Sequence, residues 1–361
     1  MNALARKMAR MIGTDGPLSI ATFMTLALHD PQHGFYASRE SIGAKGAFVT
    51  APEISQIFGE LVGLWCGQVW RDQGCPPQPR LVELGPGRGT LMQDALRALK
   101  RLPEFLAESE VVLVEGSPAL QALQRAGLRD VHVAIRWVRQ WDEITHDRPL
   151  FLVANEFFDA LPIRQFVATE RGWCERMLAL GPKGELAFAL APVPARLAVA
   201  PSRGPAGLGA IYEVSQAAEA LAETVGATVA AKGGAALLID YGYANSGFCD
   251  TLQAVAHHAK VDVLHAPGET DLSAHVDFCA LANVAQNAGA RVHGPVPQRD
   301  FLRALGIDTR AARLAAENPD RAQEIACAVD RLTGEREMGT LFRTMAIVPR
   351  DAPQPPGFQP C

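Results

Sequence analysis

The stretch Val82-Glu83-Leu84-Gly85-Pro86-Gly87-Arg88-Gly89-Thr90 is the part of the chain that determines its fold class. It begins as an apolar strand, bends through three alternate glycines and leads into a helical pattern at 90–102. Glycine lets a backbone turn sharply and lets a ligand approach it closely. Ligands of open parallel sheets bind beyond the carboxyl ends of the strands, where neighbouring loops meet. The stretch therefore predicts a ligand-binding turn between a strand and a helix.

The segments around this turn alternate between strand patterns and helix patterns. Such alternation predicts a parallel sheet with right-handed crossovers and with helices on both faces, an α/β fold. The segments expected as parallel strands are 80–84, 110–115, 131–138, 149–154 and 235–240. The segments expected as helices between them are 90–102, 118–126 and 213–231. Residues 291–296 and 342–348 are expected to pair antiparallel at the sheet edge.

Other segments interrupt this alternation. Residues 163–168 and 173–180 have strand patterns joined by Glu170-Arg171-Gly172, which predicts a hairpin. Near the N-terminus, Pro52 is expected to open one long helix, because proline is favoured at the first helical position.

These interruptions lead to an expected division of the chain. We expect residues 1–78 to form a helical N-terminal lid or substrate-side segment. Residues 79–361 are expected to form the cofactor-binding domain, with β-rich or irregular insertions near 160–210 and 243–272.

Two acidic residues at strand ends make the glycine turn more specific. Glu83 precedes the turn, where its carboxylate can face the positively charged methionine portion of S-adenosylmethionine. Glu115 ends the next strand, where a carboxylate can accept both ribose hydroxyls. We therefore predict S-adenosylmethionine as the cofactor. The predicted cofactor-binding residues are Glu83, Gly85, Gly87, Gly89, Thr90, Glu115 and Asn155.

A nicotinamide dinucleotide is the competing ligand for such a turn. Its fingerprint is G-x-G-x-x-G, with the pyrophosphate on the helix N-terminus. Here Gly89 comes one position early, Pro86 occupies the middle of the turn and Glu83 adds a negative charge nearby. A sulfonium cofactor suits these features better than a pyrophosphate.

Acidic residues also follow the fourth and fifth expected strands. The fourth strand leads into Asn155-Glu156-Phe157-Phe158-Asp159, and the fifth ends in Asp240-Tyr241-Gly242. These strand ends point to the same crevice as the glycine turn. Paired carboxylates can hold a guanidinium bidentately, orient one nitrogen and accept the departing proton. For Glu156 and Asp159, capping of a following helix explains the carboxylates equally well.

Composition and charge argue against several other classes of function. The net charge of −5 and pI near 6.0 favour no nucleic-acid partner. Seven scattered cysteines without a CxxC pair indicate neither a disulfide framework nor a zinc site, and we expect no metal. No stretch reaches the ~18 apolar residues of a membrane span. We expect a cytoplasmic protein of a bacterium, or a mitochondrial matrix protein in a eukaryote.

Several motifs in one order resemble a known family across nearly the whole chain. The family comprises the methyltransferases that assist assembly of respiratory complex I, namely the mitochondrial protein-arginine methyltransferase and its bacterial relatives. The segments that carry the resemblance are Gly16-Pro17-Leu18-Ser19, Asp30-Pro31-Gln32-His33-Gly34-Phe35-Tyr36, 50–60, 82–90, 155–162, Asp240-Tyr241-Gly242, Gly247-Phe248-Cys249-Asp250 and 274–278.

The resemblance implies a class I, Rossmann-like methyltransferase sheet of seven strands with an added lid. It also implies symmetric dimethylation of an arginine in the quinone-side, iron–sulfur-associated subunit of complex I. By carry-over, Gly85, Gly87, Gly89 and Glu115 bind the cofactor. The residues implied as catalytic, near the acceptor, are Glu156, Asp159 and Asp240. The residues implied for the lid and substrate side are Pro52, Glu53, Ser55 and Tyr36.

The chain departs from the family pattern at two places. Ala47 and Ala51 stand where relatives often carry Asp and Ser, and residues 258–264 lack the usual Asp-Pro-Leu. These departures concern the choice of acceptor more than cofactor binding. Two other functions stay open: an assembly protein that binds the cofactor without essential catalysis, which the large additions outside the sheet suggest, and a methyltransferase for a small amine. The sequence predicts no oligomeric state.

Overall fold

The computed structural model describes residues 1–37, 50–131, 133–197, 206–256 and 259–358. The chain divides into two compact units, each built from segments that are discontinuous in sequence. The sheet unit comprises residues 49–158, 221–244 and 278–361, and the accessory unit comprises residues 1–48, 159–220 and 245–277. The boundary expected at residue 78, with its lid and substrate-side roles, stays a prediction.

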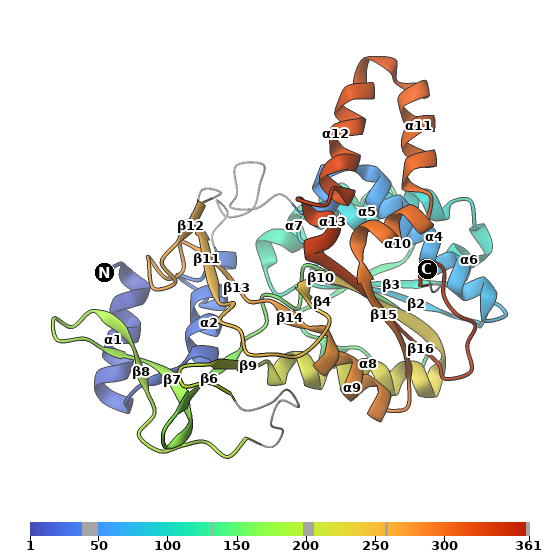
Figure 1. Cartoon of the computed structure of the whole chain (residues 1–361). Coiled ribbons are helices and arrows are strands. Elements are labelled where there is room, and N and C mark those ends of the chain that lie inside the picture. The colour runs from blue at the N-terminus through green and yellow to red at the C-terminus, as the bar shows by residue number, and fades with distance from the viewer. Residues whose placement is uncertain (38–49, 132, 198–205, 257–258, 359–361) are drawn as a thin grey trace. The chain divides into compact units, whose positions relative to one another are not determined.

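The sheet unit contains a mostly parallel sheet (Figure 1). The strands along the main path of this sheet are β2 (Arg80–Leu84), β3 (Glu110–Val114), β4 (Ile135–Val138), β5 (Leu150–Asn155), β10 (Gly234–Tyr243), β15 (Arg291–Pro297) and β16 (Phe342–Val348). Their order across the sheet is β15-β16-β10-β5-β2-β3-β4. β16 runs antiparallel to β15 and β10, and the pairs from β10 to β4 are parallel. The predicted parallel sheet and its antiparallel edge pair are confirmed.

Strand order locates the crevice of this sheet. From β2 the chain adds β3 and β4 on one side, and then returns to place β5 on the other side of β2. A reversal of this kind opens a crevice at the carboxyl ends of the two central strands, where ligands of open sheets bind. Both strands are buried along their whole lengths, as expected when helices cover both faces.

Helices cover the sheet on both faces, with α4 and α5 on one face and α8 and α9 on the other (Figure 1). The helices of the sheet unit are α3 (Ala51–Ile54), α4 (Gln56–Asp72), α5 (Thr90–Leu99), α6 (Pro103–Glu108), α7 (Pro118–Gly127), η3 (Trp141–Glu143), α9 (Phe278–Asn287), α10 (Gln298–Ala304), α11 (Ile307–Glu317), η4 (Pro319–Arg321), α12 (Ala322–Thr333) and α13 (Met338–Leu341). Helix α8 (Gln216–Lys232) begins in the accessory unit and continues into the sheet unit. No helix in these ranges or elsewhere in the described chain is long and apolar enough for a membrane crossing.

The helix expected to begin at Pro52 is two helices, so this prediction is wrong. Ser55 interrupts it with extended backbone angles, φ −154° and ψ 133°. The Ser55 hydroxyl accepts a hydrogen bond from the backbone N–H of Ile57 at 3.3 Å, which caps α4. The short helix α3 can therefore take its own direction before α4.

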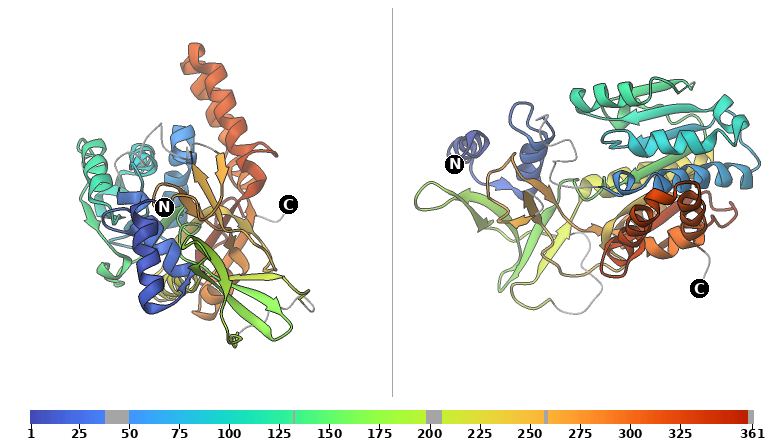
Figure 2. Two further views of the ribbon diagram at one scale, coloured as in Figure 1. Left: turned by 90° about the vertical axis from the view of Figure 1, so that its left-hand side faces the viewer. Right: turned by 90° about the horizontal axis from the view of Figure 1, so that it is seen from above.

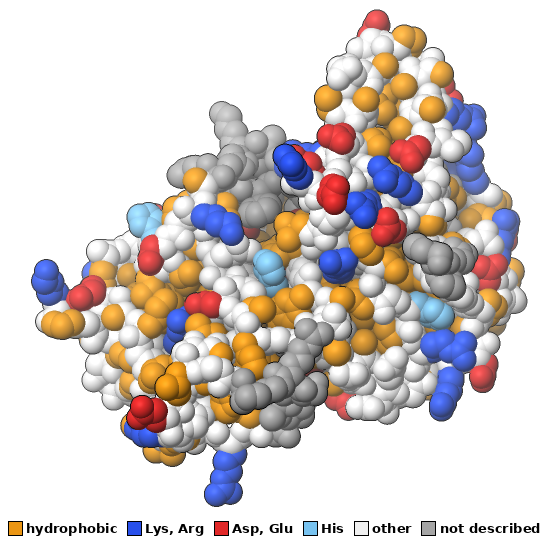
Figure 3. Space-filling view, viewed as in Figure 1, with side chains coloured by type: hydrophobic (Ala, Val, Ile, Leu, Met, Phe, Trp, Pro, Cys, Tyr) orange, Lys and Arg blue, Asp and Glu red, His pale blue; other side chains and the backbone are white. Residues whose placement is uncertain are grey.

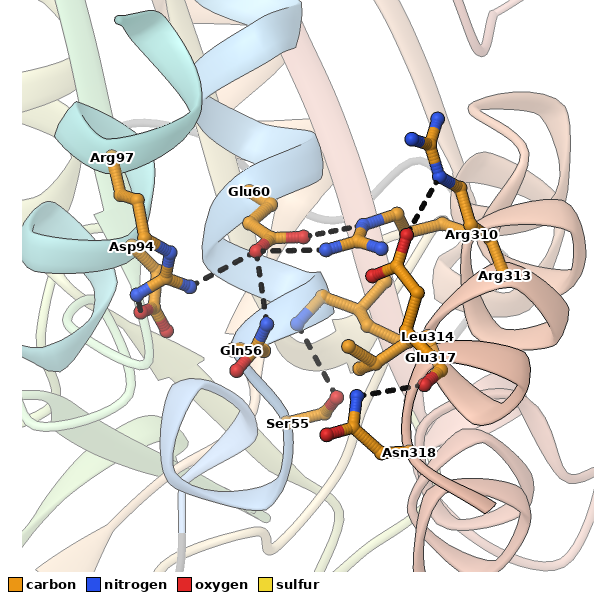
Figure 4. Close-up of polar contacts among 11 residues, drawn as sticks. Ser55, Gln56, Glu60, Asp94, Arg97, Arg310, Arg313, Leu314, Glu317 and Asn318 are labelled. Carbon is orange, nitrogen blue, oxygen red and sulfur yellow. Dashed lines mark hydrogen bonds and ion pairs between the residues drawn. The ribbon is translucent and has the colours of Figure 1, made fainter. Parts of the chain in front are cut away.

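A buried carboxylate joins α4 to two other helices (Figure 4). Glu60 of α4 accepts hydrogen bonds from Arg97 of α5 at 3.0 Å and from Arg310 of α11 at 2.8 Å. Burial opposes ionisation of this carboxyl, but the hydrogen bonds from Arg310 and Arg97 outweigh it and hold its pKa below the usual range. The contact anchors the first half of α4 from both sides.

Helices α11 and α12 form a hairpin that extends away from the sheet (Figures 1 and 2). Basic and acidic side chains alternate on its surface in Figure 3. Two of its ion pairs are Arg313–Glu317 at 3.0 Å within α11 and Arg321–Glu324 at 2.7 Å, which joins the end of η4 to the first turn of α12. Exposed pairs of this type stabilise a helix by only about 0.3–0.5 kcal/mol.

The accessory unit combines helices with two antiparallel sheets. Its helices are α1 (Ala3–Asp15), α2 (Ile20–His29) and η1 (Phe35–Ala37). The larger sheet has the order β1-β7-β6-β9 with β8 beside β7, and its strands are β1 (Leu18–Ser19), β6 (Arg164–Thr169), β7 (Gly172–Leu180), β8 (Leu186–Leu190) and β9 (Ile211–Val214). The smaller sheet has the order β12-β11-β13, from Ala259–Val261, Gln253–Ala256 and Asp271–Ser273. A further short strand is β14 (Val276–Asp277).

Part of this unit follows the sequence prediction. β6 and β7 pair antiparallel from Thr169 opposite Gly172, which confirms the expected hairpin. Helix α1 was not predicted, although Leu4, Met8 and Ile12 follow helical spacing and are buried. The helix expected from residue 213 begins at Gln216, because β9 occupies the preceding residues.

Candidate functional site

The glycine turn between β2 and α5 has left-handed backbone angles at all three glycines. The φ angles are 60° at Gly85, 53° at Gly87 and 83° at Gly89, which L side chains rarely adopt. A Cβ at Gly85 would lie 2.7 Å from the Phe157 ring, whereas a Cβ at Gly87 would meet no atom of the described residues within 4 Å. The turn therefore leaves open space beside Gly87. Thr90 begins α5 directly after it.

Glu83 lies at the end of β2 and is only 3% exposed. Its Oε2 has no hydrogen-bond partner among the described residues. Burial, and in second place the charge of Glu115, raises the pKa of Glu83 to about 8. A buried carboxylate in this position is stabilised by a cationic ligand.

Glu115 follows β3, and hydrogen bonds hold both of its carboxylate oxygens. Its Oε1 accepts from the backbone N–H of Ser117 at 2.8 Å, and its Oε2 accepts from the side-chain amide of Gln124 at 3.2 Å. Burial raises the pKa of Glu115 despite these bonds. The parallel pairing of β2 with β3 sets Leu84 opposite Val114, so Glu83, near the end of β2, and Glu115, directly after β3, lie at adjacent strand ends.

Gln124 of α7 is a further residue of this site that the sequence prediction missed. It is fully buried and donates a hydrogen bond to the carbonyl oxygen of Gly87 at 2.7 Å. Its side-chain oxygen accepts from the indole Nε1–H of Trp137 at 3.0 Å. A polar residue four positions after buried Leu120 lies on the inner face of an amphipathic helix, and this spacing was the available signal.

The end of β5 carries Asn155 and Glu156 beside β2. The Oδ1 of Asn155 is buried and has no hydrogen-bond partner among the described residues. Glu156 has a positive φ of 50°, an unusual angle for a residue other than glycine. Its Oε1 accepts hydrogen bonds from the Ala51 backbone N–H at 2.9 Å and from the Asn155 amide at 3.2 Å.

Helix α3 contacts both the turn and the end of β5. Ala51 donates the backbone bond to Glu156, and Glu53 forms an ion pair with Arg88 of the turn at 3.6 Å. Pro52 is buried, and the nearby Ser55 caps α4. Glu53, one of the predicted lid residues, thus contacts the glycine turn, while Ala47 lies outside the described residues.

Asp240 lies near the end of β10 and is 1% exposed. Its Oδ2 accepts from the Phe158 backbone N–H at 2.9 Å, and its Oδ1 accepts from its neighbour Tyr241 at 2.9 Å. Both oxygens thus contact backbone groups, one of them in the turn after β5.

Two predicted site residues belong to the accessory unit. The backbone carbonyl of Asp159 accepts a hydrogen bond from Ala274 at 3.0 Å. Tyr36 lies in η1, with its ring centroid 5.5 Å from that of His29. Burial lowers the pKa of His29, so this ring is mostly neutral near pH 7.

Comparison with known proteins identifies the family. A family model described as S-adenosyl-L-methionine-dependent methyltransferase matches residues 61–296. The chain belongs to this family. The methyltransferase is 36% identical to the Mus musculus protein arginine methyltransferase NDUFAF7, mitochondrial, over 96% of this chain and 84% of that protein. It is 34% identical to the Homo sapiens protein of the same name, over 99% of this chain and 86% of that protein.

Solved structures agree with this assignment. A Burkholderia thailandensis protein bound to S-adenosyl-homocysteine superposes on the methyltransferase with a TM-score of 0.84 and 29% identity, covering 99% of this chain and 93% of that chain. A native structure from the same organism gives a TM-score of 0.82 over the same shares. The methyltransferase uses S-adenosyl-L-methionine as its cofactor, as predicted. The unpartnered Glu83 oxygen and the open space beside Gly87 are compatible with this cationic ligand.

Ionisation of Glu83 is expected to lower the stability of the methyltransferase as pH rises. The folded protein keeps this proton up to a pKa of about 8, whereas the unfolded chain loses it near the ordinary glutamate pKa of 4.5. Because the folded state binds the extra proton between these values, its free energy of unfolding falls as pH rises through that window. We expect Glu83→Gln to raise the melting temperature more at about pH 9 than at about pH 5.

Thermal unfolding followed by circular dichroism, without cofactor, measures this effect. Glu104→Gln is the control, because Glu104 is exposed and its pKa is lowered by the hydrogen bond from Arg71. Its effect on melting is expected to be the same at both pH values. An equally pH-independent effect of Glu83→Gln contradicts the buried, protonated carboxyl.

Proposed function

We propose that the methyltransferase transfers a methyl group from S-adenosylmethionine to an arginine side chain of a protein. The observation that carries this proposal is the alignment of relatives named protein arginine methyltransferase over 96% of the chain or more. The acidic end of β5, beside the glycine turn, supports it chemically.

In this proposal the cofactor lies at the carboxyl ends of β2, β3 and β5. The backbone at Gly85, Gly87, Gly89 and Thr90 forms its cradle. Glu83 faces the positively charged methionine portion, Glu115 accepts the ribose hydroxyls and Asn155 lines the pocket between them. The bound cofactor supplies an electrophilic methyl group on a sulfonium.

A guanidinium needs help to act as a nucleophile, because its lone pair is delocalised and its pKa exceeds about 12. We propose that Glu156 and Asp159 hold the acceptor guanidinium, orient one nitrogen toward the methyl group and take up the released proton. The hydrogen bonds that Glu156 accepts from Ala51 and Asn155 orient its carboxylate. Pro52, Glu53 and Tyr36 are proposed to close the site on the substrate side.

Asp240 has a different part in this proposal. Both of its oxygens accept backbone N–H groups, so it acts as a positioning residue that holds the turn of Glu156 and Phe158. Ser55 likewise supports the site by ending α3 and capping α4.

The resemblance to complex I assembly methyltransferases leads us to propose the acceptor protein. We propose the quinone-side subunit of complex I, dimethylated symmetrically in the bacterial cytoplasm or the mitochondrial matrix. The named relatives are mitochondrial proteins, which is consistent with the second compartment.

Gly87→Val is expected to abolish cofactor binding. The added side chain enters the open space beside the turn, and valine strains a backbone with φ 53°. We expect the affinity for S-adenosylhomocysteine to fall by about 100-fold or more, the equivalent of ~3 kcal/mol, in calorimetry. Gly127→Ala, in a position without positive φ or close neighbours, is the control. A folded Gly87→Val protein with unchanged affinity would falsify the assigned cradle.

Glu156→Gln and Asp159→Asn are expected to retain cofactor binding and to lose methyl transfer. Each change keeps the shape of the side chain but removes the negative charge that orients the guanidinium. We expect turnover to fall by about 100-fold or more, as for removal of other groups that act in the transition state. A radiolabelled methyl-transfer assay measures turnover and calorimetry measures binding, with Glu104→Gln as the control. Undiminished turnover in both variants rejects the role of these carboxylates.

Mass spectrometry of methylated arginines, with and without this gene, tests the acceptor. We expect a symmetrically dimethylated arginine in the quinone-side subunit of complex I to disappear from the deletion strain and to return with the wild-type gene. Return with the Glu156→Gln gene, or an unchanged arginine-methylation profile in the deletion strain, contradicts protein-arginine methylation. Loss of complex I assembly with unchanged methylation instead supports an assembly role without catalysis.

A further inference from the structure

Gln124 connects three elements that meet at the carboxyl edge of the sheet. From α7, its amide nitrogen donates to the Gly87 carbonyl oxygen at 2.7 Å and to the Glu115 carboxylate at 3.2 Å. Its amide oxygen accepts from Trp137 of β4 at 3.0 Å. Gln124 is fully buried, and its side chain bonds both to the glycine turn and to the Glu115 carboxylate.

These partners require the amide of a glutamine. Two acceptors, the Gly87 carbonyl and the Glu115 carboxylate, face the amide nitrogen, and one donor, the Trp137 indole N–H, faces the amide oxygen. A carboxylate cannot donate to the first two, and an apolar side chain satisfies none of the three. The stem of Gln124 also lies against the turn, since a Cβ at Gly89 would be 3.2 Å from its Cγ.

We propose that Gln124 is the positioning residue that couples the glycine turn to Glu115, and so determines how well the protein recognises the ribose of its cofactor. This inference rests on the proposed role of Glu115 as the acceptor of the ribose hydroxyls. One oxygen of Glu115 is oriented by the Ser117 N–H and the other by Gln124. Without the second bond, the carboxylate can rotate relative to the turn that holds the rest of the nucleoside.

The bond also affects the charge of Glu115. Burial favours its neutral form, while the hydrogen bond from Gln124 favours the carboxylate and lowers its pKa. A carboxylate can accept hydrogen bonds from two hydroxyls at once. In the neutral acid one oxygen carries the proton, so the group accepts fewer hydrogen bonds. Gln124 therefore supports both the orientation and the ionised state that ribose recognition needs.

Gln121 provides a matched control on the same helix, one turn earlier. Its amide donates to the backbone carbonyl of Glu115 at 2.7 Å, and not to the Glu115 carboxylate. A Gln121→Leu protein thus loses a hydrogen bond to the same residue while the Glu115 carboxylate keeps both partners.

The test compares binding of S-adenosylhomocysteine and of its 2′-deoxyribose analogue, by calorimetry, in wild type, Gln124→Leu, Gln124→Glu and Gln121→Leu. We expect wild type and Gln121→Leu to prefer the ribose ligand by about tenfold or more, as for loss of a hydrogen bond to a charged group. In Gln124→Leu we expect this preference to fall to about threefold or less, along with a lower affinity for S-adenosylhomocysteine. An equal loss of affinity for both ligands in Gln124→Leu, with the preference retained, overturns the proposal in favour of a general packing role.

Gln124→Glu keeps the test valid if the leucine variant does not fold. Its added carboxyl lies beside Glu115 and can donate a hydrogen bond only when protonated. We expect its affinity for S-adenosylhomocysteine to rise by about tenfold from about pH 8.5 to about pH 6, relative to wild type. A pH dependence equal to that of wild type overturns the coupling. Failure of wild type to bind S-adenosylhomocysteine at all refutes the proposed cofactor site itself, which is a different outcome.

Discussion

The burial of two carboxylates at adjacent strand ends is the constraint on which this site depends. Glu83 lies near the end of β2 and Glu115 directly after β3, and the charge of Glu115 contributes to the raised pKa of Glu83. Two buried acids so close together destabilise the folded chain unless protons, hydrogen bonds or a cation compensate them. Glu115 accepts hydrogen bonds at both oxygens, whereas Glu83 has an oxygen without a partner among the described residues. The folded protein thus keeps an unfavourable arrangement, which a cation beside Glu83 would stabilise.

The supporting contacts around these acids come from backbone and amide groups. Gln124 joins the turn to Glu115, Asp240 holds the backbone after β5, and Ala51 of α3 donates to Glu156. Each of these bonds links residues that are distant in sequence but lie at one edge of the sheet. Strand order therefore sets the geometry of the site, and the side chains adjust it locally.

Sequence patterns predicted the parts of this arrangement that have a local physical cause. Alternate glycines, buried apolar strands and acids at strand ends can each be recognised within a few neighbouring residues. The break at Ser55 could not be recognised in this way. The helical periodicity continues through Ser55, although its hydroxyl caps the next helix. The backbone contact of Asp240 spans 82 residues, so a strand-end carboxylate could equally have been a ligand group. The sequence prediction missed Gln124 because its role depends on three hydrogen-bond partners, and these partners come together only in the folded chain.

The order of the strands has a consequence for synthesis of the chain on the ribosome. Edge strand β15 pairs with β16 in the described sheet, and β16 is made last of the sheet strands although it lies between β15 and β10. The accessory unit likewise needs a third segment, which extends to residue 277, before it is complete. The central strands and the glycine turn can therefore form early during synthesis. Strand β15, in contrast, has no strand to pair with until β16 has been synthesised.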